Sequence, residues 1–305
     1  MKFVIIGYGV QGKKRHKILK NNVVSVVDPH VKNCQPTIED VSLDSYDAII
    51  ICVPDEQKVK FINFAINNNK HLMIEKPLMF KNLNEFKIIE KKANKEKILI
   101  YTCYNHRFEP HIINLKKIID KKKYGKIYYL NFFYGNGTAK LVKKSPWRDK
   151  KKSGVIEDLG SHLIDLILFL FNRKTLDAKS FNISKLENKS PDYCLFSIKL
   201  GNFFINCEVS LCSWKNSFNM DFFSSKGSIH IENLCKWGPS KLITRERKYP
   251  SGKPKEKIKI LRLLDPTWQQ EYKYFKRKIK LKEKTDLSND YVIQKMLKKI
   301  SNHVI

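Results

Sequence analysis

Short apolar runs alternate with amphipathic stretches over the first hundred residues of this 305-residue chain. The run 48–53 is apolar throughout, which is typical of a strand buried on both faces. In 56–67 and 83–93 the apolar positions recur every three or four residues, as on one side of a helix. Strands that alternate with helices predict a parallel sheet covered by helices on both faces. The predicted strands are 3–6, 23–27, 48–53, 71–74 and 98–102.

The pattern changes after about residue 105. A helix is predicted at 112–123, a strand at 127–134 and a very apolar helix at 158–171. Further strands are predicted at 181–186, 193–200, 203–211, 219–224 and 228–232, and two helices at 268–279 and 288–300. Gly201-Asn202 and Ser225-Lys226-Gly227 are turn sequences between four of these strands. Successive hairpins form an antiparallel sheet, so this part is predicted to be α+β.

A glycine-rich segment directly follows the first predicted strand and opens a helical stretch. It reads Gly7-Tyr8-Gly9-Val10-Gln11-Gly12 and matches the G-x-G-x-x-G pattern of dinucleotide-binding loops. In such a loop the first glycine permits a tight turn, the second lets the backbone approach the pyrophosphate, and the third lets helix and strand pack closely. The helix N-terminus then offers free N–H groups to the phosphates. All six residues are predicted to contact the cofactor.

Asp28 ends the next predicted strand, where a carboxylate can accept hydrogen bonds from the ribose hydroxyls of the cofactor. This favours NAD, because the 2′-phosphate of NADP would meet a like charge. His30 and Lys32 follow closely and would neutralise that phosphate. NAD is therefore the predicted cofactor, and NADP stays open.

The formal net charge of +29 has two interpretations. A basic surface attracts phosphate-rich partners, but Lys-Lys pairs are spread along the chain and form no single stripe. We favour lysine at ordinary solvated positions and expect neither a nucleic-acid nor a membrane partner. Seven cysteines without a C-x-x-C pair indicate reduced thiols and no metal site, and the N-terminus lacks signal-peptide features. These features predict a cytoplasmic protein.

Several motifs follow the glycine loop in a set order. They are Cys52-Val53-Pro54, Glu75-Lys76-Pro77, Asn105-His106-Arg107, Trp147-Arg148, and Asp158-Leu159-Gly160-Ser161-His162 continuing to Asp165. With the loop, this series resembles the glucose–fructose oxidoreductase / inositol dehydrogenase / MocA (Gfo/Idh/MocA) family over nearly the whole chain. The resemblance implies reversible NAD(P)-dependent oxidation of a hydroxyl on a sugar, cyclitol or nucleotide-sugar. It also implies a C-terminal domain whose open sheet often makes oligomer contacts.

The same resemblance assigns the candidate site residues. Lys76 matches the active-site lysine of the family, and Asp158 and His162 match its usual acid/base pair. Pro54 and Glu75 are expected beside Lys76 at the cofactor. The expected substrate-binding residues are Asn105, Arg107, Trp147, Arg148 and Asp165.

The residues support this assignment on their own terms. On one helix, positions 158, 162 and 165 share a face. From Asp158 to Phe171 the chain has no Lys or Arg, so we expect a largely buried helix whose three polar groups face an internal cleft. His162 titrates near neutral pH and could take the hydroxyl proton, while Asp158 could orient its ring. Structural hydrogen bonding, or an N-cap role for Asp158, is the alternative.

Other roles remain open. Lys76 would supply positive charge to the substrate oxygen, and Lys76 and His162 could exchange acid and base roles. Arg107 or Arg148 could hold an anion and Trp147 could pack on a sugar ring, whereas Arg107 could instead anchor the crossing between domains. Lys152-Ser153-Gly154 stands where relatives often have a Gly-Gly pair, which leaves the substrate undecided.

The expected architecture is an α/β protein of two domains. A Rossmann dinucleotide-binding domain covers 1–104, and an α+β substrate and oligomerisation domain with an open, mainly antiparallel sheet covers 105–305, its final helix free to pack back on the first domain. The predicted function is an NAD(P)-dependent oxidoreductase acting on CH–OH groups of a sugar, cyclitol or nucleotide-sugar. Surface-polysaccharide biosynthesis is one setting for such an enzyme, and a homodimer or homotetramer is expected. A non-catalytic dinucleotide-binding regulator on the same fold is the alternative.

Overall fold

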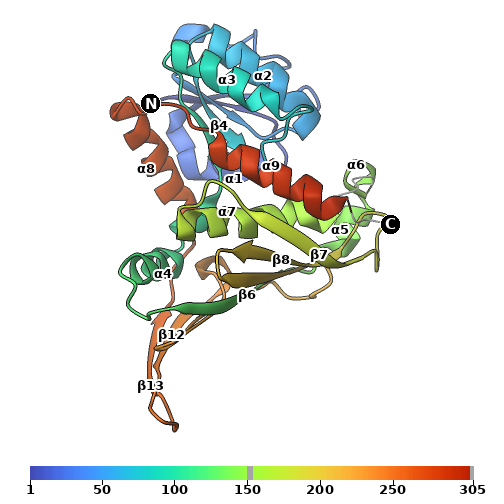
Figure 1. Cartoon of the computed structure of the whole chain (residues 1–305). Helices are drawn as coiled ribbons and strands as arrows, with labels where there is room; N and C mark the ends of the chain where they lie inside the picture. Colours follow the sequence, from blue (N-terminus) through green and yellow to red (C-terminus); the bar gives the residue numbers. More distant parts are fainter. Residues whose placement is uncertain (150–153, 303–305) are drawn as a thin grey trace. The chain divides into compact units, whose positions relative to one another are not determined.

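The computed structural model describes residues 1–149 and 154–302 (Figure 1). Its internal contacts divide the chain into two compact units. Unit 1 comprises Met1–Asn105 and Thr267–Gln294, and unit 2 comprises His106–Pro266 and the chain from Lys295. The predicted second domain contained the whole tail after residue 105. Only the final helix of that tail was expected to be free to pack on the first domain. In the structure the segment Thr267–Gln294, which also contains the helix before it, belongs to unit 1.

Unit 1 contains a five-stranded parallel sheet in the order β2-β1-β3-β4-β5. Its strands are β1 (Phe3–Ile6), β2 (Val23–Val27), β3 (Ala48–Ile51), β4 (His71–Glu75) and β5 (Ile100–Cys103). Its helices are α1 (Val10–Leu19), α2 (Asp55–Asn67), α3 (Asn84–Lys95), α8 (Thr267–Lys280) and the first part of α9 (Ser288–Ser301). The predicted parallel Rossmann sheet is thereby confirmed.

Two apolar clusters cover the two faces of this sheet. One face packs on α2 and α3 through side chains such as Ile62 and Phe86. The other face packs on α1 and α8, where Phe275 is fully buried and contacts the ring of Phe3. The central strands are therefore buried on both sides, as their uninterrupted apolar sequences require.

Unit 2 contains an eight-stranded sheet in the order β13-β12-β11-β10-β6-β9-β8-β7. Every neighbouring pair is antiparallel except β6 and β9, which run parallel. The strands are β6 (Ile127–Gly135), β7 (Asp177–Ser184), β8 (Tyr193–Leu200), β9 (Phe203–Ser210), β10 (Ser217–Ser224), β11 (Gly227–Glu232), β12 (Ser240–Glu246) and β13 (Lys255–Leu261). The helices are α4 (Pro110–Asp120), α5 (Ala139–Lys143), α6 (Pro146–Asp149) and α7 (Ser161–Phe171). The predicted mainly antiparallel sheet is confirmed.

The details of unit 2 correct several predictions. Both predicted hairpins are present, and Gly201 takes a φ of +64° in the first. The strand predicted at 181–186 begins earlier, at Asp177. The hairpin β12–β13 was not predicted at all, because its alternation is short and half of its strand residues are charged. It forms one edge of the sheet (Figure 1).

The apolar helix predicted at 158–171 is built differently at its start. Residues Ile156–Gly160 form a π-helical turn, and α7 begins only at Ser161. The common-face argument assumed a single α-helix, so it applies to His162 and Asp165 and not to Asp158. Nine of the eleven residues of α7 are buried, which confirms that a stretch without lysine or arginine lies in the core.

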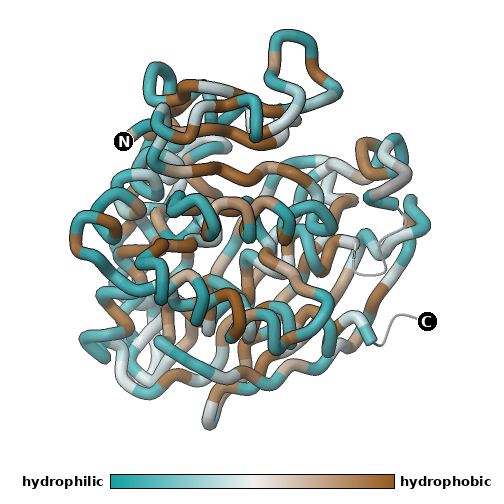
Figure 2. The backbone as a smooth tube through the Cα atoms, turned by 90° about the horizontal axis from the view of Figure 1, so that it is seen from above, coloured by the Kyte–Doolittle hydropathy of each residue, from teal (hydrophilic) through white to brown (hydrophobic). Residues whose placement is uncertain are grey.

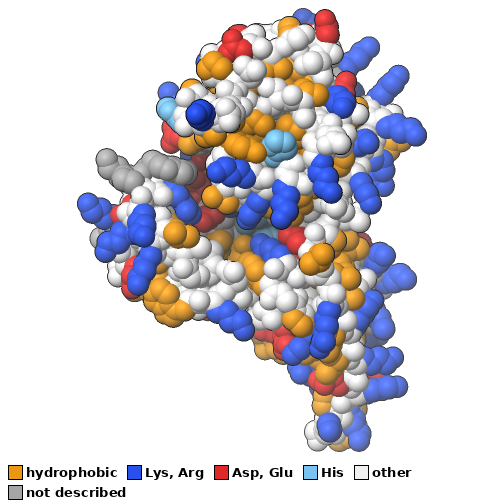
Figure 3. All heavy atoms as spheres, turned by 180° about the vertical axis from the view of Figure 1, so that it is seen from behind, with side chains coloured by type: hydrophobic (Ala, Val, Ile, Leu, Met, Phe, Trp, Pro, Cys, Tyr) orange, Lys and Arg blue, Asp and Glu red, His pale blue; other side chains and the backbone are white. Residues whose placement is uncertain are grey.

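Hydrophobic and hydrophilic stretches alternate along the backbone (Figure 2). Lysine and arginine side chains are distributed widely over the face shown in Figure 3. This distribution agrees with lysine at ordinary solvated positions. Among the described residues, no helix combines the length and the apolar character needed to cross a membrane.

Candidate active site

The glycine loop lies between β1 and α1 in unit 1, and each glycine has its own steric role. Gly7 has a φ of +90°, and a Cβ there would lie 2.9 Å from the backbone of Cys52. A Cβ on Gly12 would lie 2.0 Å from the carbonyl oxygen of Gly7, so helix and strand pack closer than alanine permits. A Cβ on Gly9, by contrast, would have no protein atom within 4 Å. Within the described residues, steric crowding therefore explains two of the glycines and leaves the third for a ligand.

The start of α1 has the features of a phosphate site. Gly9 is the N-cap, and no side chain of the described residues caps the first turn. Val10, the first helical residue, is 70% exposed, and Gln11 is also exposed. First-turn N–H groups have no partner inside a helix, so those of α1 are suited to phosphate oxygens. The geometry fits a dinucleotide pyrophosphate.

Asp28 follows β2 directly and is held in place by the loop. Its Oδ2 accepts a hydrogen bond from the backbone N–H of Tyr8 at 2.7 Å, and its Oδ1 accepts one from the N–H of His30 at 3.0 Å. The half-buried carboxylate is thereby fixed beside the glycine loop. Each carboxylate oxygen can accept more than one hydrogen bond, so this position fits ribose hydroxyls.

Lys76 follows β4 directly and is half-buried, and its peptide bond to Pro77 is cis. Pro54 lies in the same unit as the N-cap of α2, just beyond β3. Glu75, which directly precedes Lys76 and is predicted to contact the cofactor, is paired with another side chain. Its Oε1 accepts hydrogen bonds from the guanidinium of Arg15 at 2.7 Å. This pairing supports a structural role for the Glu75 carboxylate.

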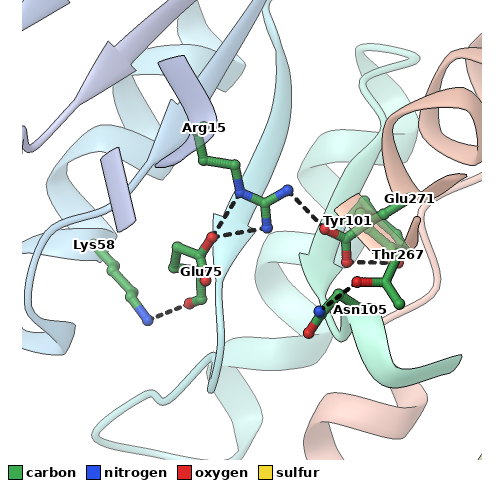
Figure 4. A network of polar contacts seen from close by, with 7 residues as sticks. All are labelled: Arg15, Lys58, Glu75, Tyr101, Asn105, Thr267 and Glu271. Atoms are coloured by element: carbon green, nitrogen blue, oxygen red, sulfur yellow. Dashed lines mark hydrogen bonds and ion pairs between the residues drawn. The ribbon is translucent and has the colours of Figure 1, made fainter. Parts of the chain in front are cut away.

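Arg15 is the centre of a buried polar network (Figure 4). Besides Glu75 it binds Glu271 of α8 at 2.7 Å, and its guanidinium lies 4.3 Å from the ring centroid of Trp268. Glu271 also accepts a hydrogen bond from the hydroxyl of Tyr101 at 3.3 Å. Burial raises the pKa of the Glu271 carboxyl from 4.5 to about 7, against the lowering effect of Arg15. The network joins the glycine-loop helix, β4 and α8 within unit 1.

In unit 2, His162 of α7 lies in an aromatic cluster. Its ring stacks on that of His106 with centroids 4.1 Å apart, and the ring centroid of Tyr134 is 5.9 Å away. The Nζ of Lys236 lies 3.2 Å from Nε2 of His106. His162 is only 7% exposed. A titratable imidazole is thus held among buried rings with a cation nearby.

Asp158 lies in the π-helical turn and interacts with Arg148 of α6 at 3.0 Å. Burial raises the pKa of the Tyr134 hydroxyl, and the negative charge of Asp158 raises it further. The charge of Asp158 therefore acts on Tyr134, one of the rings around His162. Trp147 also belongs to α6. Lys152 and Ser153 lie outside the described residues.

The structure pairs two predicted substrate-binding residues with each other. Arg107 forms a bidentate ion pair with Asp165, in which Nε of Arg107 is 2.8 Å from Oδ2 of Asp165. Asp165 is 1% exposed, and burial raises the pKa of its carboxyl while Arg107 lowers it. In unit 1, the amide of Asn105 donates to the hydroxyl of Thr267 at 2.8 Å. These contacts favour structural roles for Arg107, Asp165 and Asn105.

Comparison with protein-family models decides the family. Residues 1–104 match the model described as an oxidoreductase family with an NAD-binding Rossmann fold, and residues 112–230 match the GFO/IDH/MocA C-terminal domain. The chain belongs to the Gfo/Idh/MocA family. The match to the Rossmann model contains the glycine loop, and the match to the C-terminal model contains Asp158 and His162.

Individual relatives carry sugar and cyclitol names. The chain is 29% identical over 57% of its length to a glucose-6-phosphate 3-dehydrogenase of Bacillus subtilis, covering 53% of that protein. It is 23% identical over 66% of its length to a scyllo-inositol 2-dehydrogenase (NADP+) of the same organism, covering 60% of it. The matched part of the chain thus spans only about half the length of these curated relatives.

Solved structures agree with the fold over the full length. A UDP-N-acetylglucosamine 3-dehydrogenase from Acidithiobacillus ferrooxidans superimposes with a TM-score of 0.80 at 16% identity, covering all of this chain and 97% of that one. An oxidoreductase from Agrobacterium radiobacter, in complex with NAD+, L-tartaric acid and magnesium, gives 0.79 at 14% identity, covering 100% and 96%. At such identities the likeness shows the shared Gfo/Idh/MocA fold alone.

Sequence reasoning missed several residues of this family member. His106 was part of a quoted motif, but its stacking on His162 was not foreseen. Lys236 and Tyr134 come from segments without any motif, so only the fold brings Lys236 to His106 and Tyr134 to His162. The buried cations Arg15 and Lys58 looked like ordinary surface residues. For Arg15 the sequence did hold a signal: it lies three positions after Gly12 and therefore on the same, buried face of α1.

Proposed function

We propose that this chain is an NAD(P)-dependent oxidoreductase that interconverts a hydroxyl and a keto group on a sugar, cyclitol or nucleotide-sugar. The glycine loop carries the proposal, because the space at Gly9 has no explanation in the packing of the described residues. Two relatives with glucose-6-phosphate and UDP-N-acetylglucosamine in their names suggest a phosphorylated hexose. Nucleotide-sugar chemistry for surface polysaccharides fits the same class.

The residues have complementary roles in this reaction. The bound nicotinamide would accept or give the hydride. We propose that His162 takes the hydroxyl proton during oxidation and returns it during reduction. Lys76 would stabilise the negative charge that develops on the substrate oxygen. Asp158, paired with Arg148, would stabilise the imidazolium that forms when His162 takes the proton. Arg148 or Trp147 would contact the sugar or its phosphate.

Substitution of Gly9 tests the cofactor loop without disturbing the fold. The Cβ of G9A meets no protein atom within 4 Å, so the melting temperature should stay unchanged. The same methyl group would occupy the space of the pyrophosphate, and the Kd for NADH and NADPH should rise at least about tenfold. G12A is the contrasting variant, because its Cβ clashes with Gly7 and should destabilise unit 1. Unchanged dinucleotide binding by G9A would contradict the proposed loop.

A substrate screen tests the proposed reaction. NADH and NADPH are first titrated against the protein, since Asp28 favours NAD while His30 and Lys32 suit NADP. UDP-N-acetylglucosamine, glucose 6-phosphate and myo-inositol are then offered with NAD+ or NADP+, and the reduced-nicotinamide absorbance is followed. We expect turnover of at least one phosphorylated hexose. Tight dinucleotide binding without turnover of any sugar would favour a regulatory protein.

We also propose a homo-oligomer in the cytoplasm. Tyr129 of β6 lies beside Phe204 and Phe223 on the neighbouring strands and stacks on Phe223 with centroids 4.7 Å apart. Tyr129 and Phe204 are 42% and 52% exposed, so this row suits contact with a second copy. All seven cysteines are free thiols, which suits a reducing compartment. A mass of 35.9 kDa in sedimentation equilibrium would contradict the oligomer.

A further inference from the structure

Lys58 lies on the core-facing side of α2, where an apolar side chain is expected. It is 2% exposed and shares this side with Ile62, Ala65 and Ile66. Burying an ammonium group is unfavourable unless it is paired and fully hydrogen-bonded. A methionine or leucine would fill the same position without that cost. The contacts of the Lys58 ammonium group should therefore show what compensates for its burial.

The ammonium group of Lys58 has three N–H donors and three close acceptors. Its Nζ lies 2.7 Å from Oδ1 of Asp55, one turn earlier on α2. It also donates to the backbone carbonyl of Glu75 at 2.5 Å and to that of Pro77 at 2.7 Å. Asp55 balances the charge, and the two carbonyls complete the donor set. Figure 4 shows the side chain reaching Glu75.

These two carbonyls lie on either side of Lys76. One nitrogen therefore fixes the backbone both before and after that residue. A second buried cation, Arg15, fixes the Glu75 side chain at 2.7 Å. The segment that carries Lys76 is thus held by its backbone from α2 and by its preceding side chain from α1. Such double anchoring exceeds what is needed to end a strand.

We infer that Lys58 is a positioning residue, which sets the backbone of Lys76 and so the reach of its ammonium group. The inference rests on the proposed role of Lys76. A displacement of about 1 Å at a reacting group costs up to about 10²-fold in rate. Loss of the anchor should therefore lower turnover and leave the glycine loop, and with it dinucleotide binding, largely unchanged.

Hydrogen exchange of the whole protein tests the anchor itself. K58M keeps the side-chain length and removes the donors, K58R keeps several donors, and K60M removes an exposed lysine from the same helix. In K58M the backbone amides of Glu75, Lys76 and Leu78 should exchange at least about tenfold faster than in the wild type. K58R should restore part of the protection, and K60M should match the wild type. Unchanged exchange in K58M would overturn the inference.

A double-mutant cycle tests whether Lys58 acts through Lys76. With a sugar that is turned over in the screen, K58M should lower kcat about tenfold and change the Kd for NADH by less than about twofold. In a K76M background, K58M should cause no further loss of kcat, because the group that it positions is gone. If the losses of kcat in K58M and K76M multiplied in the double variant, the positioning role would be overturned.

Failure of the proposed function is distinguishable from failure of this inference. A K76M enzyme as active as the wild type would remove Lys76 from the reaction, and the lack of any turnover would remove the reaction itself. Neither result changes the hydrogen-exchange comparison, which by itself decides whether Lys58 holds the segment. Slow exchange at 75–78 in K58M would refute the anchor even in an active enzyme.

Discussion

Replacement of His162 by alanine is expected to lower kcat by about 10²–10⁴-fold, while the Kd for NADH and NADPH stays within about twofold of the wild type. The reason is that His162 supplies the proposed acid/base group and belongs to unit 2, whereas the glycine loop belongs to unit 1. Stopped-flow or steady-state absorbance of the reduced nicotinamide measures the first quantity, and fluorescence titration measures the second.

A second buried histidine of unit 2 serves as the control for this variant. His111 of α4 is hydrogen-bonded to the carbonyl of Ser240 at 3.2 Å and is 1% exposed. H111A should reduce stability, because it removes a buried hydrogen-bonded ring, but it should retain most of the turnover per folded molecule. If H162A and H111A lost activity equally, the loss would reflect damage to unit 2 and the acid/base assignment would be wrong.

The stability of the protein is expected to fall with rising pH because of Glu271. A buried carboxyl whose pKa is raised from 4.5 to about 7 binds its proton more tightly in the folded than in the unfolded chain, which corresponds to about 3 kcal/mol. This contribution is present in full below pH 4.5 and is lost as the pH rises to about 7. Urea unfolding across this range measures it.

The comparison with E271Q isolates the carboxyl. Relative to E271Q, the free energy of unfolding of the wild type should decline by about 3 kcal/mol between pH 4.5 and pH 8. E39Q removes a carboxylate at an exposed position and should follow the wild type at every pH. Parallel curves for the wild type and E271Q would show that Arg15 and Tyr101 compensate fully for burial of the charge.

The sequence predicted unit 1 well because its signals are local. The strands 3–6 and 23–27 were predicted with the boundaries that the structure has, since short runs of β-branched and other apolar residues, next to Gly7 and Asn22, leave little choice. The glycine pattern was equally informative, because Gly7, Gly9 and Gly12 form their motif within six consecutive residues directly after a strand. Function could be inferred from those parts without tertiary information.

Other features depend on contacts between distant residues and could not be predicted. Glu271 meets Arg15 across 256 positions, and Lys58 meets the carbonyl of Glu75 across 17. The π-helical turn before α7 has the same apolar spacing as an α-helix, so the pattern at Asp158 could not separate them. In each case the decisive partner is supplied by the fold.

The edge strand β13 carries charges that should oppose edge-to-edge association of the large sheet of unit 2. All but the last of its residues are exposed, and such an edge offers unpaired backbone groups to a strand of another molecule. Lys255, Lys257 and Lys259 project from alternate positions on one side of it, so a second copy approaching edge to edge would bring like charges together. We expect part of the high positive charge to favour solubility in this way, and this effect should weaken as salt screens the lysines. In the proposed homo-oligomer, copies of the protein would then meet through a sheet face while their edges stay apart.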